Sequence, residues 1–234
     1  MQKYNIKFKI AIFNFALFAF SFSFALAQTA PEFLISWQAI NYVPADYQGK
    51  ILPSKSGRVE AGFDLIDKNK IIDLSKNTIS WFLNENLIAS GVGVKTASFN
   101  VNSNLNQTVR ITVFGYGQNN LDQVFLLPVA NPEIIISTKT PLKTIRNQNW
   151  LPLQNYNFEA KPFFFNISDL TFLQFKWRVN NNLVEGTPNN TALLSLNLQS
   201  QGAPKETQLT VSVGASNALN PLEFASKMIN FIVK

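Results

Sequence analysis

Neither cysteine nor histidine occurs among the 234 residues of this chain. Without cysteine there is no disulfide, no thiol nucleophile and no thiolate metal site, so each folded unit must be held by its apolar core alone. Without histidine the commonest general base and metal ligand is missing, and Ser-His-Asp and Cys-His catalytic arrangements are excluded. These absences favour a protein that has no cofactor, no bound metal and no enzymatic activity.

Acidic side chains are missing from the first 31 residues, where lysines stand at positions 3, 7 and 9. These three lysines supply half of the formal net charge of +6, and the rest of the chain carries 17 basic against 14 acidic residues. That balance is ordinary for a soluble surface. We therefore expect no nucleic-acid partner.

An apolar run from Ile10 to Leu26 follows the lysines and ends in Ala25-Leu26-Ala27. A charged start, an apolar middle and small residues at the −3 and −1 positions are typical of a secretory signal peptide cleaved before Gln28. The alternative is an uncleaved membrane anchor, because the run approaches the length that spans a bilayer. Residues 1–27 are thus predicted to be a signal peptide or an anchor helix. Either one places residues 28–234 outside the cytoplasm, secreted or attached to the membrane or cell surface.

An internal repeat organises the rest of the chain. Four segments return in the same order at offsets of 101, 99, 96 and 99 residues, and small drifts are what loop insertions between fixed strands produce. The repeat predicts two tandem domains, residues 31–130 and 132–234, with almost no linker between them. The matched segments are 31–36 with 132–137, 51–53 with 150–152, 81–88 with 177–184, and 108–115 with 207–214.

Hydrophobic residues alternate with polar ones at a period of two, which is typical of half-buried β-strands. Apolar positions 173, 175, 177 and 179 alternate with Gln174, Lys176 and Arg178, and positions 79 to 83 show the same pattern in the first copy. The Asn-x-Asn triplets 84–86 and 180–182 predict hairpin turns, because asparagine tolerates a left-handed φ. About seven short strands per copy predict an all-β protein with two antiparallel β-sandwiches.

The tryptophan in the central strand of each copy, the turn after it and the closing alternating strands resemble the immunoglobulin-like and PKD-like repeats of bacterial exported proteins. The resemblance covers both copies and is architectural, since the Asp-Gly turn of PKD repeats is absent. It implies an immunoglobulin-like sandwich in each copy. It also implies a role as a spacer, an adhesion module, or a module that binds protein or carbohydrate.

Two groups of carboxylates could carry chemistry. Paired acids serve glycoside hydrolysis, but only Glu60 recurs in the second copy, as Glu159, which favours a role in the fold. Asp64, Asp67 and Asp73 could offer oxygen ligands to Ca²⁺, although their spacing matches no EF-hand loop. Solvated charges in turns are the simpler interpretation of these three.

Five aromatic residues are candidates for the core or for a binding surface. Trp81 and Trp177 lie on the apolar side of the strongest strands and are predicted to be core residues rather than sugar platforms. Three consecutive phenylalanines at 163–165 must point at least one ring away from the core if they lie in a strand. Trp150, Phe163 and Phe165 are therefore candidates for an interaction surface, or for contact with the other module.

The sequence favours a non-enzymatic exported protein that acts as a spacer, adhesion or protein-interaction module at a cell surface. The alternative is a carbohydrate-binding protein that uses exposed aromatic side chains. The partner is thus an extracytoplasmic protein or a glycan, and the N-terminal helix contacts a membrane if it is not cleaved.

Overall fold

The structure is a computed structural model that describes residues 30–117, 119–138, 143–145, 148–151, 154–188, 190–198 and 207–233. The predicted signal or anchor segment, residues 1–27, lies outside the described residues. Within the described part every element is a β-strand except one 3-10 turn, η1 (Leu170–Phe172), so the prediction of an all-β protein is confirmed. No helix in this part is long and apolar enough to cross a membrane.

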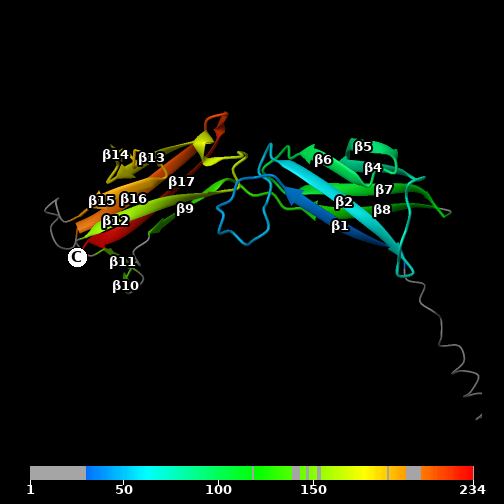
Figure 1. The fold of residues 1–234 in the computed structure, drawn as a ribbon, viewed down its shortest axis with the longest axis horizontal. Coiled ribbons are helices and arrows are strands. Elements are labelled where there is room, and N and C mark those ends of the chain that lie inside the picture. Colours follow the sequence, from blue (N-terminus) through cyan, green and yellow to red (C-terminus); the bar gives the residue numbers. More distant parts are fainter. Residues whose placement is uncertain are drawn as a thin grey trace, which may run out of the picture. The chain divides into compact units, whose positions relative to one another are not determined.

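Residues 32–127 form two sheets of four strands (Figure 1). Strands β1, β2 and β3 follow one another in the first sheet, and β6 also pairs with β2; the second sheet has the order β5-β4-β7-β8. The strands of the first sheet are β1 (Glu32–Ala39), β2 (Arg58–Asp67), β3 (Lys70–Ile71) and β6 (Thr96–Asn100), and those of the second are β4 (Thr78–Leu83), β5 (Asn86–Val92), β7 (Gln107–Tyr116) and β8 (Asn119–Leu127).

Strands β2 and β4 bury alternate hydrophobic side chains in the space between the two sheets. Val59, Ala61 and Phe63 on β2 are buried, as are alternate residues of β4, because successive side chains of a strand point to opposite faces. The rings of Phe63 and Trp81 meet edge to face, with centroids 5.8 Å apart. This contact places the core of residues 32–127 between β2 and β4.

Residues 133–233 also form two sheets (Figure 1), of three and six strands, with the orders β15-β12-β9 and β10-β11-β17-β16-β13-β14. Their core joins both sheets, since the rings of Phe158 on β12 and Phe231 on β17 lie 5.6 Å apart. The strands are β9 (Glu133–Thr138), β10 (Lys143–Ile145), β11 (Gln148–Leu151), β12 (Asn155–Phe163), β13 (Leu173–Val179), β14 (Asn182–Val184), β15 (Leu193–Asn197), β16 (Thr207–Asn217) and β17 (Asn220–Val233).

In the structure, the fourth pair of matched segments is related by an offset of 102 residues, whereas the sequence comparison gave 99. Trp81 pairs with Ile111 on β7, whereas Trp177 pairs with Val213 on β16, and both partners are buried. An offset of 99 would equate the buried Ile111 with Thr210, which is half exposed. The predicted match of 108–115 to 207–214 is therefore wrong by three residues. An odd slip in a strand moves every side chain to the opposite face.

Candidate functional site

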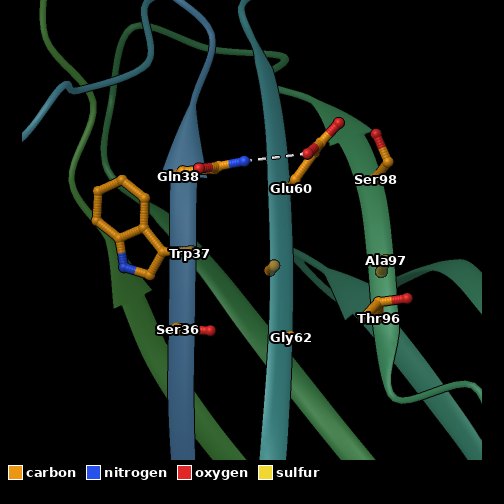
Figure 2. Close-up of a pocket in the computed structure, with 9 residues that line it drawn as sticks. Ser36, Trp37, Gln38, Glu60, Gly62, Thr96, Ala97 and Ser98 are labelled. Atoms are coloured by element: carbon orange, nitrogen blue, oxygen red, sulfur yellow. Dashed lines mark hydrogen bonds between the residues drawn. The ribbon is translucent and has the colours of Figure 1, made fainter.

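A groove of about 550 Å³ lies on the outer face of the sheet that contains β1, β2 and β6 (Figure 2). Its polar side chains point outward because their neighbours Ala39, Ala61 and Ala97 point into the core and are buried. The groove is lined by Ser36, Trp37, Gln38, Glu60, Ala61, Gly62, Thr96, Ala97 and Ser98.

Polar side chains connect the three strands at one end of the groove. The Gln38 amide donates to Glu60 Oε2 at 3.2 Å, as Figure 2 shows. The other oxygen of Glu60 lies 3.6 Å from Arg58 Nη2, and Arg58 Nε donates to the Ser98 hydroxyl at 2.9 Å. Exposed pairs of this kind contribute little to stability, commonly about 0–1 kcal/mol. They do connect one carboxylate, one amide and one guanidinium across the three strands.

Gly62 leaves the middle of the groove open. It lies opposite Thr96 in the β2–β6 register, and a Cβ added at Gly62 would stand 3.3 Å from Thr96 Cγ2. The corresponding residue of the second copy, 99 positions later, is Lys161, whose Nζ donates to Asp46 Oδ2 at 2.6 Å. A long cationic side chain thus occupies in one copy the position that is empty in the other.

Trp37 is the aromatic residue at this groove, and its ring lies on the other side of β1 from Gln38 (Figure 2). The Lys50 ammonium stands over that ring, 3.6 Å from its centroid. A cation held over an aromatic face is attracted by the ring quadrupole. One face of Trp37 is therefore already covered, and the groove offers hydroxyl, amide and carboxylate groups rather than a stacking surface.

The acidic side chains of the described residues form no metal centre. No group of three acidic, histidine or cysteine side chains there could hold a metal ion. Asp73, one of the three acids considered for Ca²⁺, accepts hydrogen bonds from the Ser75 N–H at 2.9 Å and from the Ser75 hydroxyl at 3.0 Å. Both bonds lower the pKa of the Asp73 carboxyl, and the bond from the backbone N–H has the larger effect. Asp73 therefore caps a turn.

Trp81 and Trp177 are core residues with exposed fractions of 0% and 1%. Each indole N–H donates at 2.9 Å to a backbone carbonyl, that of Val94 for Trp81 and that of Thr191 for Trp177. The sequence places both residues in the core but gives no sign that each indole makes such a hydrogen bond. The acceptor lies in a loop 13 residues after Trp81 and 14 residues after Trp177.

The three residues predicted to form an interaction surface lie in different environments. Phe165 is fully buried in the core of residues 133–233, so the prediction of a surface role is wrong for it. The reason is that β12 ends at Phe163, and Phe164 then adopts a φ of +61°, so the three rings do not alternate as in a strand. Phe163 is half-buried and meets Tyr47 edge to face at 5.6 Å. Trp150 lies in β11, where it pairs with Lys143 and Ile232.

The groove residues Ser36, Gln38, Gly62, Thr96 and Ser98 were missed by sequence reasoning. The alternation along each strand shows that they face away from the core, but not that β1 and β6 flank β2. A polar residue at every second position is the only signal that the sequence carries for them.

No protein-family model matches the chain, and no curated protein matches it. The fibronectin(III)-like modules of Clostridium thermocellum CbhA are 10% identical over 86% of this chain and 94% of theirs, with a TM-score of 0.31. Three N-terminal domains of the outer capsid protein Hoc of bacteriophage RB49 are 11% identical over 87% of this chain and 59% of theirs, with a TM-score of 0.44. SGBP-B of the Bacteroides ovatus mixed-linkage glucan utilization locus, solved with a heptasaccharide, is 13% identical over 88% of this chain and 47% of its own, with a TM-score of 0.26. These likenesses assign no family.

Proposed function

We propose that this chain is an exported, non-enzymatic interaction protein whose residues 31–130 and 132–234 form two immunoglobulin-like β-sandwich modules. The internal repeat and the two pairs of facing sheets support this division. The charged start and the Ala25-Leu26-Ala27 site support export, and an uncleaved N-terminal helix would hold the protein at a membrane. Such a chain would serve as an adhesion or spacer protein outside the cytoplasm.

The groove on the first module is the proposed contact surface for a protein partner. The observation that carries this proposal is the open position at Gly62, flanked by side chains that can each donate or accept hydrogen bonds. Protein interfaces outside obligate complexes are about as polar as the rest of the surface and carry many hydrogen bonds. Glu60 and Arg58 bring one charge of each sign, so the groove selects by shape and hydrogen bonding rather than by net charge.

Site-specific photo-crosslinking tests this function. A benzoyl-phenylalanine placed at Thr96 should give one discrete protein adduct in the cells that make the chain. The same probe at Ser226, an exposed residue of β17, should not give it. Adding Gly62→Lys fills the groove as Lys161 does in the second copy and should abolish the Thr96 adduct. Absence of an adduct from Thr96 and from Ser36, or equal adducts from Ser226, would contradict the proposal. Circular dichroism confirms that each variant is folded.

A further inference from the structure

We propose that a second cavity, of about 430 Å³, binds a neutral carbohydrate unit. It shares no residue with the groove at Gly62, so the inference goes beyond the protein contact proposed above. Its lining includes Ser54, Asn104, Asn131, Asn220, Glu223 and Phe224. Volumes of this size are ordinary for small-molecule sites.

The floor of the cavity is a buried and ordered carboxylate. Glu223 is only 7% exposed, yet it lines the cavity. Its Oε1 accepts from the Asn166 N–H at 2.7 Å and from the Ser54 hydroxyl at 3.3 Å, and its Oε2 accepts from the Asn217 amide at 2.6 Å. An ionised carboxylate has about four acceptor positions, and three are occupied here. The remaining position can accept a hydrogen bond from a ligand hydroxyl.

Asparagine amides supply the walls. Within the described part of the chain, the side chains of Asn104, Asn131 and Asn220 make no hydrogen bond. Each amide both donates and accepts, as does each hydroxyl of a sugar, so the two chemistries are complementary. Lys55 on the lining carries one positive charge and Glu223 one negative charge, and this balance favours a neutral ligand over an anion or a cation.

Apolar side chains complete the site. Phe224 and Leu222 on β17 line the cavity and are 67% and 89% exposed. An exposed aromatic ring beside convergent polar groups is the arrangement expected of a binding site rather than of a core. The C–H face of a pyranose ring can pack on the Phe224 ring while its hydroxyls reach the amides. One pyranose unit presents an apolar C–H face and several hydroxyls within the dimensions of this cavity, and this combination favours a sugar over a peptide.

Calorimetric titration of the chain from residue 28 onward tests the site. The probes are the hexasaccharides of glucose, mannose, galactose and N-acetylglucosamine, with a polar peptide of similar length as the competing ligand class. We expect at least one hexasaccharide to bind, and Phe224→Ala and Asn131→Ala each to weaken that binding about tenfold or more. Phe114→Ala, a change at another exposed ring on β7, should leave the affinity unchanged.

The outcomes separate the two proposals. Gly62→Lys should leave sugar binding intact, because Gly62 lies outside this cavity. The inference is overturned if no hexasaccharide binds at millimolar concentration, if only the peptide binds, or if Phe114→Ala weakens binding as much as Phe224→Ala does. None of these results affects the crosslinking test at Thr96. Circular dichroism again establishes that each variant folds.

Discussion

At the scale of single residues, the two tryptophans show how a core side chain combines apolar burial with one hydrogen bond. Trp81 and Trp177 are buried, and both indole N–H groups reach a backbone carbonyl at 2.9 Å. A buried donor without a partner costs about 1–3 kcal/mol, so a large ring with a polar edge is stable in a core only where an acceptor meets it. Val94 and Thr191 supply that acceptor at corresponding places in the two repeats.

Trp177→Ala should lower the free energy of unfolding by about 3–5 kcal/mol, because it removes a large buried ring and leaves a cavity. Trp177→Phe should lower the free energy of unfolding by a smaller amount, because it keeps a large apolar ring. It removes only the indole N–H that donates to the Thr191 carbonyl, and so measures the contribution of that hydrogen bond. Urea titration followed by circular dichroism measures both changes. A loss below about 1 kcal/mol for Trp177→Ala would be incompatible with a core role.

The pKa of Asp73 predicts part of the acid sensitivity of the fold. Hydrogen bonds from Ser75 and the nearby Lys76 and Lys95 lower the folded-state pKa of this carboxyl. Because the folded-state value lies below the unfolded-state value of about 3.9, the carboxylate stabilises the fold above about pH 4. That stabilisation is lost as the pH falls through the folded-state value.

Asp73→Ala should therefore make the loss of stability below about pH 4 less steep. Asp169→Ala should act in the same direction, because the Thr171 N–H donates to Asp169 at 2.8 Å and lowers its pKa. Thermal unfolding recorded at several acidic pH values measures the slope. An unchanged slope in both variants would show that neither carboxyl couples to folding.

At the scale of elements, the hairpins β4–β5 and β13–β14 repeat one turn. Asn84 and Glu85 have φ values of +47° and +65°, and Asn180 and Asn181 have +48° and +67°. Two consecutive left-handed residues define the two-residue turn that matches the twist of antiparallel strands. The Oδ1 of Asn84 also accepts from the Thr108 N–H, and that of Asn180 from the Thr210 N–H, both at 2.9 Å. Each turn is thus bonded to the next strand of its sheet.

Asn180→Ala should destabilise the protein by about 2 kcal/mol, because alanine is strained at a left-handed φ and the bond to Thr210 is lost. Asn180→Gly should cost less, since glycine adopts this φ without strain. Asn182→Ala, at an exposed position with no left-handed φ, is the matched control. Equal losses for Asn180→Ala and Asn182→Ala in a urea titration would show that the turn geometry is unimportant.

The elements also show the limit of pattern matching along the chain. Alternating polarity predicts that β7 and β16 are strands and which residues face the core, such as Ile111 and Val213. Sequence similarity alone aligned these strands three residues out of register, because Thr and Val recur at several positions in both. The pairing of Trp81 with Ile111 and of Trp177 with Val213 sets the register, and that pairing is a property of the sheet.

At the scale of the whole molecule, export is the clearest expectation from the sequence. The apolar run from Ile10 to Leu26 should enter a membrane while the lysines before it stay on the cytoplasmic side. Protease added to intact cells, or to spheroplasts where an outer layer intervenes, should therefore digest residues 28–234. Mass spectrometry of the N-terminus distinguishes a chain that starts near Gln28 from one that keeps its helix. A chain that stays protected after the outer layers are opened would contradict export.

The sequence by itself determined the all-β class, the burial of Trp81 and Trp177 and the left-handed turns at Asn84 and Asn180, because each depends on local alternation or on the φ preference of one residue. Only the tertiary structure decided the rest. Gly62 lies opposite Thr96 because β2 pairs with β6, and Glu223 meets Ser54, which lies 169 residues away in the sequence. Phe165 lies in the core because the positive φ of Phe164 ends the alternation of the strand before it. Such contacts depend on which strands become neighbours, and a periodicity along one strand contains no information about the strand beside it.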